Sequence, residues 1–162
     1  MQIGLTTIEM KLLEHGIKSF STKDMNDLVS VIANKESKSF IEVTSDYLLD
    51  YHKKLKINWL TEMSDETVMN GFESSNGHIY RTEGGDQFRM LATMVVMMIN
   101  QNLTSINWKT EDAGYLPLSK EEFTTVFLEG FQHAHSTLEK YNTLKSNVEN
   151  ATTDDEILSI TW

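Results

Sequence analysis

The sequence lacks cysteine and contains a single proline in 162 residues. Without cysteine there is no disulfide framework, no thiolate metal site and no cysteine nucleophile, which suits a protein that folds in a reducing cytosol. The longest apolar run covers residues 94–99, far short of the roughly 20 residues that a membrane-spanning helix needs. Residues 1–5 show neither the basic segment nor the apolar run of a signal peptide. We therefore expect synthesis in a cytoplasm and no association with a membrane.

Basic residues are also scarce. Lysine and arginine number 14 against 24 aspartate and glutamate residues, which gives a formal net charge of −10. An acidic surface repels a phosphate backbone, so we expect no nucleic-acid partner. The densest basic run, Lys53-Lys54-Leu55-Lys56, is short and falls in a predicted amphipathic helix, where we interpret it as a solvated face. Apolar residues still make up 40% of the chain, which is enough for the core of a domain of typical size.

Apolar residues in the first third of the chain recur at helical spacing. Residues 6–9 match a capping box and Gly16 offers a stop, which predicts a short first helix. A second helix should cover about residues 22–34, followed by a polar connection over residues 35–38. The inward faces would be formed by Ile8, Leu12 and Leu13 in the first helix and by Met25, Leu28, Val29 and Ile32 in the second.

The helical period continues over residues 39–70. This segment is either one long helix or two helices that break near residues 64–65. A long amphipathic helix of this kind is a coiled-coil arm, a partner-binding segment or a core helix of a small bundle, and the sequence leaves these interpretations open.

Turn residues become frequent after residue 70. Asn76-Gly77 fits the left-handed backbone of a tight turn, so residues 71–82 should form a β-hairpin. Residues 83–86 are predicted to be a loop in which Asp86 caps the following helix. That helix, residues 88–100, is the most apolar of the chain, and we interpret its methionines as core filling rather than as an adaptable binding surface. Its buried side should be formed by Leu91, Met94, Val95, Met98 and Ile99.

A second hairpin is predicted over residues 105–118, with Gly114 in its turn and Pro117 at a sheet edge or strand end. A capping box at residues 119–122 then starts a long helix to about residue 150. Thr152 or Thr153 should cap a last short helix over residues 154–158.

The fold class that follows is α+β. N-terminal helices precede a small antiparallel sheet of two β-hairpins, which packs against two long helices, and a short C-terminal helix closes the chain. We divide the sequence into a helical N-terminal segment, residues 1–50, and a helix-hairpin-helix-hairpin-helix domain, residues 51–162.

No group of residues predicts catalysis or metal binding. His133 and His135 point about 200° apart on a helix and cannot share an ion, and the other three histidines stand alone. Gly84-Gly85 lacks the neighbours that complete a phosphate-binding motif. Loop and cap duties account for the loop carboxylates Glu83, Asp86, Glu111 and Asp112. We therefore expect no enzymatic activity, no metal and no cofactor.

Three tryptophans are the candidate partner-contact residues: Trp59, Trp108 and Trp162. The last of them ends the chain, where it either docks on the core or is offered to a partner. Docking is favoured, because an exposed indole near Ile160 would form an adhesive patch.

An ordered series of short signatures runs through residues 51–162. It includes Gly71-Phe72, Asn76-Gly-His-Ile-Tyr-Arg-Thr82, Asp86-Gln87, Ile106-Asn-Trp-Lys-Thr110, Asp112-Ala-Gly114, Leu116-Pro-Leu-Ser119 and the closing Ala151–Trp162. Their order and spacing resemble a domain of unknown function that is common in tailed-phage genomes, in small tail proteins and at the C-termini of tail-fibre and tail-fibre-assembly proteins. Residues 59–69 depart from the Ala-rich, basic first helix of that family, and residues 1–50 resemble no known family.

The resemblance implies a viral structural protein of a tail, baseplate or tail-fibre attachment apparatus, made in the host cytoplasm and incorporated in the virion tail. Its partners would be other phage tail, baseplate or fibre proteins, with a homo-oligomer also possible, and we expect residues 1–70 to mediate assembly. The alternative is a tail-fibre assembly chaperone that is absent from the virion. An enzyme acting on host polysaccharide would need a carboxylate pair in a cleft, and no aromatic-lined cleft is indicated by the sequence.

Overall fold

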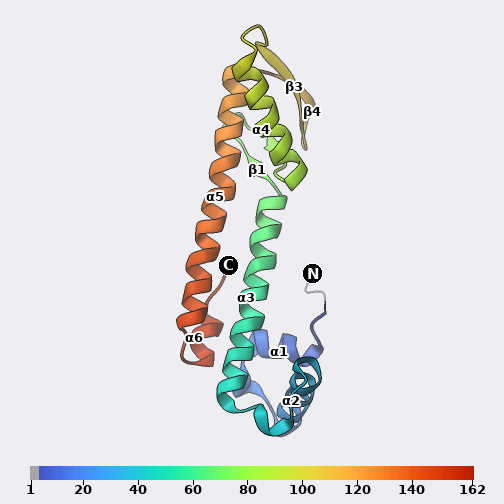
Figure 1. Ribbon diagram of the computed structural model, residues 1–162, viewed down its shortest axis with the longest axis vertical. Helices are drawn as coiled ribbons and strands as arrows, with labels where there is room; N and C mark the ends of the chain where they lie inside the picture. The colour runs from blue at the N-terminus through green and yellow to red at the C-terminus, as the bar shows by residue number, and fades with distance from the viewer. Residues whose placement is uncertain (1–3) are drawn as a thin grey trace. The chain divides into compact units, whose positions relative to one another are not determined.

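The computed structural model describes residues 4–162, and residues 1–3, part of the segment inspected for a signal peptide, lie outside the described residues. Figure 1 shows a mostly helical chain with two small hairpins. The helices are α1 (Thr7–His15), α2 (Thr22–Glu36), α3 (Ser45–Met69), α4 (Gly84–Ile99), α5 (Lys120–Asn150) and α6 (Asp154–Ser159), with short 3-10 turns at Ile17–Ser19 and Phe40–Glu42. The strands are β1 (Phe72–Glu73), β2 (Ile79–Tyr80), β3 (Ser105–Thr110) and β4 (Gly114–Ser119).

The predicted α+β class is confirmed, with a correction to the sheet. Both hairpins are antiparallel, with Phe72 opposite Tyr80 in the first and Thr110 opposite Gly114 in the second, but they form two separate two-stranded sheets. The backbone N–H of Glu111 donates to the carbonyl of Ile79 over 2.9 Å, which joins the end of one hairpin to the other. A single ladder did not form because the first hairpin contributes only two paired residues per strand.

Two compact units are built from the chain. One comprises residues 1–63 and 141–162, and the other comprises residues 64–140. The helices α3 and α5 each contribute residues to both units. The sequence-based boundary at residue 50 remains a prediction, and it falls inside the continuous helix α3. That helix also settles the alternatives for residues 39–70: it runs without a break through residues 64–65, while residues 40–42 form a separate 3-10 turn.

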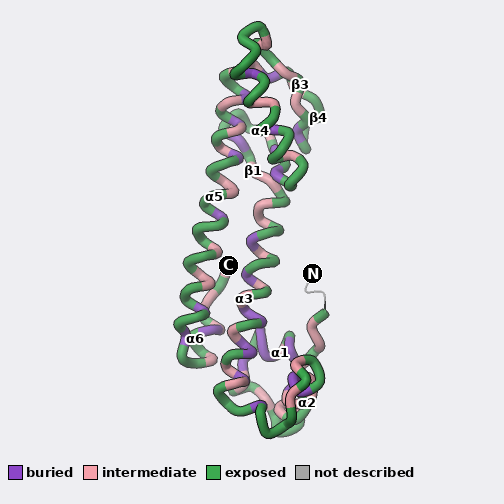
Figure 2. The backbone as a smooth tube through the Cα atoms, viewed as in Figure 1, coloured by how far each residue is buried: buried purple, intermediate pink, exposed green. Residues whose placement is uncertain are grey.

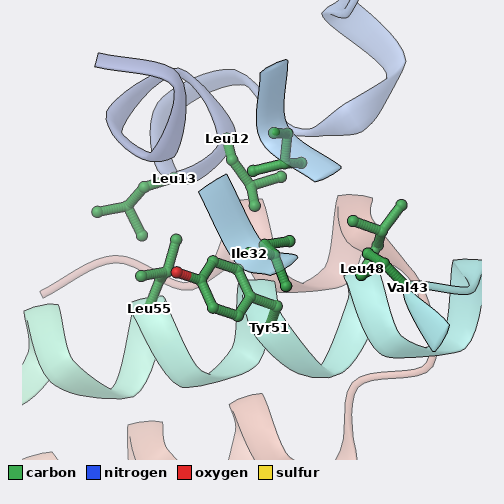
Figure 3. Packing of buried hydrophobic residues seen from close by; sticks show 8 residues of the cluster. Leu12, Leu13, Ile32, Val43, Leu48, Tyr51 and Leu55 are labelled. Carbon is green, nitrogen blue, oxygen red and sulfur yellow. The ribbon is translucent and has the colours of Figure 1, made fainter. Parts of the chain in front are cut away.

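The core of the first unit is formed where α1, α2 and α3 meet. Leu12, Leu28 and Ile32 are fully buried, and Tyr51 and Leu55 of α3 face them (Figure 3). The predicted inward faces of α1 and α2 are thereby confirmed. The caps agree as well: Thr6 and Glu9 form a capping box at α1, and Gly16 ends that helix with φ of +68°.

A buried polar group lies inside this unit. The Glu9 carboxylate is fully buried and accepts hydrogen bonds from the Tyr51 hydroxyl and from Lys35, whose Nζ lies 2.8 Å from Oε2. Burial alone would raise the pKa of Glu9, but hydrogen bonds from Lys35, Tyr51 and Thr6 outweigh it and hold the pKa at about 2. Residues 35 and 36 were predicted to lie in a polar connection; that prediction is wrong, because both belong to α2 and Lys35 reaches back to Glu9.

The short helix α6 is fixed to the same unit by one carboxylate. Asp154 accepts hydrogen bonds from the backbone N–H of Ile17 at 2.6 Å and from Nδ1 of His52 at 2.5 Å. Thr153 caps the helix, as one of the two threonines was predicted to do, and Ile157 is fully buried. Glycine is required at position 16, because a Cβ there would lie 2.0 Å from Oδ2 of Asp154.

The second unit contains both hairpins, α4 and the first two thirds of α5. Its core is formed by the buried Tyr80, Met90, Met97, Leu118, Phe123 and Val126. Gly77 has the left-handed φ of +81° that was predicted for the first turn, and Gly114 has +77° in the second. Glu122 and Ser119 form the predicted capping box at the start of α5, which runs to Asn150 as expected.

Candidate protein-interaction surface

The apolar side of α4 that was predicted to be buried is exposed, so that prediction is wrong. Met90 and Met97 are the buried residues of this helix, while Leu91 exposes 52% of its area and Val95 44%. Met98 and Ile99 are exposed as well, and Met94 is half-buried. At about 100° per residue, the exposed apolar positions are centred opposite Met97. The apolar periodicity therefore identified a side of α4 that the described residues 4–162 leave exposed (Figure 2).

The position of α4 is set at both of its ends. Its first turn begins at Gly84, with Glu83 at the N-cap position and no side-chain cap, so the predicted capping role of Asp86 is wrong. Asp86 instead pairs with Arg89 one turn later. At the other end, Nζ of Lys120 donates to the carbonyl of Met97 over 2.9 Å, which ties the last turn of α4 to the first turn of α5.

A groove lies between α4 and the neighbouring part of α5, which run beside each other in Figure 1. It has a volume of about 680 Å³. Phe88 and Leu91 line it from α4, and Leu128 and Phe131 line it from α5; all four are exposed. A polar side chain of the groove is engaged, because the Gln87 amide donates to the carbonyl of Thr82 over 2.6 Å. The walls of the groove are therefore almost wholly apolar.

The groove is continuous with the outer side of α4, because Val95, Met98 and Ile99 follow Leu91 at spacings of four, seven and eight residues. We call the whole area the α4–α5 apolar surface and define it by Phe88, Leu91, Val95, Met98, Ile99, Leu128 and Phe131. No charged residue occurs between Met90 and Ile99. A helix that is apolar on nearly all sides is normally buried, and large exposed apolar patches are typical of interaction sites.

The three candidate tryptophans lie elsewhere and are not brought together into one site. Trp59 packs on the core of the first unit, with Nζ of Lys56 4.6 Å from its ring centroid. Trp108 packs on the core of the second unit, and its ring centroid lies 5.0 Å from that of Phe123. Trp162 is half-buried. Lys56 is itself buried, so the prediction that residues 53–56 form a solvated face is wrong for this residue.

The histidines are placed by carboxylates and backbone groups. His52 pairs with Asp154, and His78 lies 2.8 Å from Asp112, so the prediction that these two stand alone is wrong. Nε2 of His133 donates to the backbone carbonyl of Thr67 in α3 over 3.1 Å, while Nε2 of His135 lies 3.3 Å from Oε1 of Glu139. Among residues 4–162, no three His, Cys, Asp or Glu side chains gather as ligands of a metal ion.

Two of the carboxylates that were predicted to lie in loops, Asp86 and Asp112, are engaged in structural contacts. Asp112 bridges the two hairpins, because it accepts from Nδ1 of His78 and from the backbone N–H of Ile79. The hydrogen bond from His78, followed by that from Ile79, lowers the pKa of Asp112 to about 2. A small polar cleft of about 310 Å³ near this loop includes Arg81, Glu111 and Tyr115. Its charges are mixed, with Glu111 3.9 Å from Arg81, so it offers no net charge to a ligand.

Comparison with models of known protein families gives a match that covers residues 51–161 of the chain. The chain belongs to the family described as a domain of unknown function, DUF4376. The match covers the hairpins, α4, α5 and α6, and it includes every residue of the α4–α5 apolar surface. Neither the comparison with curated proteins nor that with solved structures found a match. Within residues 4–162, each helix is too short or too polar to cross a bilayer.

The sequence contains a signal for this surface, although its apolar pattern was interpreted as core filling. The stretch from Met90 to Ile99 carries apolar residues at nine of its ten positions, with Thr93 the exception. A helix at the edge of a small domain needs only one apolar stripe, so the surplus pointed to a second contact. Leu128 and Phe131 continue this surface on α5, and their spacing alone does not distinguish them from core positions.

Proposed function

We propose that this protein is a structural component of a tailed-phage tail, baseplate or tail-fibre attachment apparatus, and that it acts by protein–protein interaction through the α4–α5 apolar surface. The observation that carries the proposal is the exposure of Phe88, Leu91 and Phe131 around one groove, since their exposed fractions are 72%, 52% and 62%. The phage setting is supported by the resemblance of residues 51–162 to a domain common in tail and tail-fibre proteins.

The chemistry of the groove favours a protein segment over a small polar substrate. Its lining offers almost no unoccupied hydrogen-bonding groups, because Gln87 and Thr82 are already engaged with backbone carbonyls. An apolar groove between two helices is suited to an amphipathic helix or another apolar segment. Two carboxylates that general acid–base chemistry could use are already engaged: Asp86 pairs with Arg89, and Asp112 accepts from His78 and from the backbone N–H of Ile79.

The assembly-chaperone alternative uses the same surface but for a transient contact. A chaperone would cover an apolar segment of a fibre protein until that segment is built into the particle, and it would then leave. The expectation that residues 1–70 mediate assembly stays a prediction, and the α4–α5 apolar surface lies outside that range.

The test is mass spectrometry of purified particles from a phage that carries this gene. We expect the protein at a fixed stoichiometry relative to the major tail protein. Absence from particles that are assembled normally would contradict the structural role and leave the chaperone. The contact itself is tested by complementing a deletion with Phe131→Asp, which should abolish incorporation.

Tyr115→Asp is the matched control, because Tyr115 is 73% exposed and Phe131 is 62% exposed, but Tyr115 lies on β4 and belongs neither to the proposed surface nor to residues 1–70. We expect the Tyr115 variant to be incorporated normally. Equal incorporation of both variants would show that the α4–α5 apolar surface is not the contact.

A further inference from the structure

The outer side of α4 raises a separate question, which is what covers it. Val95 and Ile99 lie one turn apart on this side, and they expose 44% and 79% of their areas. The small residue Ala92 lies between them and Phe88 along the same stripe and is exposed as well. A small side chain in the middle of such a stripe allows a second helix to approach closely. The stripe is therefore shaped to receive a helix along its length.

We propose that this helix is α4 of a second copy of the chain, packed antiparallel across a two-fold axis that passes near Val95. The inference rests on the proposal that the α4–α5 apolar surface is an assembly interface, and it names the partner. In a two-fold contact the same patch meets itself, so the patch must be self-complementary. An uncharged apolar stripe meets this condition, whereas a charged stripe would repel its own copy.

The area available is sufficient. The seven side chains of the surface expose between 44% and 79% of their areas. At roughly 150–200 Å² for each large apolar side chain, they offer roughly 650–850 Å² per copy. A stable interface of standard size buries about 800 Å² per partner. Pairing of two α4–α5 units along this surface would form a four-helix arrangement with an apolar seam.

Charge adds a condition that distinguishes this partner from others. Each chain carries a net charge of −10, so two copies repel each other at long range. The stripe of α4 brings no charged side chain of its own into the contact, because residues 90–99 carry none. Added salt screens the repulsion, so association of two copies should tighten as salt is raised. A contact with a basic partner would weaken instead.

The experiment uses the full chain in sedimentation equilibrium at low and high salt, with Val95→Asp, Val95→Lys and an equal mixture of the two. We expect a dimer for the natural chain that tightens with salt, monomers for each variant alone, and recovery of the dimer in the mixture, where opposite charges meet across the axis. Ile41→Asp is the control; Ile41 is 91% exposed in the first unit, and its variant should dimerise like the natural chain.

Each result separates this inference from the proposed function. A monomeric natural chain, or a dimer that survives both Val95 variants, would overturn the second copy as partner. If the natural chain is monomeric while Phe131→Asp still loses its place in particles, the surface docks on another protein, and the proposed function stands without this inference. A dimer that depends on Val95 but is absent from particles would keep this inference and overturn the structural role.

Discussion

The two compact units differ in how they use apolar side chains. The first unit encloses a core between α1, α2 and α3, and among its described residues only Met10, Phe40 and Ile41 are large apolar side chains with more than a third of their area exposed. The second unit has a smaller core and leaves the α4–α5 apolar surface open. The first unit therefore encloses most of its large apolar side chains, whereas the second leaves a continuous apolar surface exposed.

Polar groups show the same contrast. The first unit buries Glu9 and His52 and supplies each with a partner from a distant part of the sequence. Buried ionisable groups of this kind need well-placed partners and so fix the arrangement of the elements that carry them. In the second unit the buried polar side chains are neutral, such as Ser74, Thr82 and Thr110. The buried ionisable groups that fix the arrangement of helices are thus found in the first unit, while the second unit carries the larger exposed apolar area.

The largest effect should come from exchanging one leucine in each unit for alanine. Leu12 is fully buried, so Leu12→Ala should lower the free energy of unfolding by about 2–5 kcal/mol, from lost burial and the cavity left behind. Leu91→Ala removes the same atoms from a side chain that is 52% exposed, and the protein at high dilution should lose less than about 1 kcal/mol.

Urea denaturation measures both variants, with amide hydrogen exchange to assign the loss to a unit, because two units need not unfold together. A comparable loss of stability in the two variants would contradict this difference between the units, since it would place Leu91 in the core. A loss of stability in the Leu91 variant that appears only at high protein concentration would support the difference, because association would then be the source of the stability.

A smaller effect is expected from the carboxylate that holds α6. Asp154→Ala leaves the N–H of Ile17 and the ring of His52 without their acceptor, and we expect a loss of about 2–4 kcal/mol, since removal of a charged acceptor strands buried donors. Asp155 is the matched control: it occupies the same helical turn and pairs with Lys18 at the surface. Asp155→Ala should cost less than about 0.5 kcal/mol, as exposed ion pairs contribute little. If the two variants lose the same stability in thermal denaturation, the specific hydrogen bonds of Asp154 do not hold α6, and only the negative charge of the two aspartates contributes.

The elements that the sequence predicted correctly are those set by neighbouring residues. Caps formed by Thr6 and Thr153, and turns containing Gly77 and Gly114, follow rules that act over a few positions. The failures have two physical causes. The pairing of His52 with Asp154 spans 102 residues, which no local pattern indicates.

The exposed stripe of α4 failed for a different reason. Periodicity reports which side of a helix avoids water, but it does not say whether the cover comes from the same chain or from another. The side that was predicted to be buried, from Leu91 to Ile99, is exposed and forms the centre of the candidate site. The sequence pattern thus located the apolar residues of this side but assigned them to the core of the chain, where they do not lie. The Val95 variants test whether a second copy covers them.

The smallest effect concerns pH, and it should be confined to the first unit. Burial lowers the pKa of His52 below its ordinary value of 6.5, although the hydrogen bond and charge of Asp154 act in the opposite direction. As the pH falls below about 6.5 the unfolded chain therefore takes up this proton before the folded chain does. The contribution of His52 to the free energy of unfolding should be constant above that pH. At lower pH this contribution should decrease, by at most about 1.4 kcal/mol per pH unit, until the pH reaches the lowered pKa.

His52→Asn isolates the effect, because the asparagine side-chain N–H₂ occupies the place of Nδ1 and keeps a donor for Asp154 without titrating. Denaturation midpoints between pH 7.5 and 5 should then lose their slope, while the exposed control His135→Asn should keep it. Amide protection should decline with pH in the core of α1–α3 and remain level around Tyr80 and Phe123, since the histidines of the second unit are not buried. An unchanged slope in the His52 variant would assign the pH dependence to other groups and remove this distinction between the units.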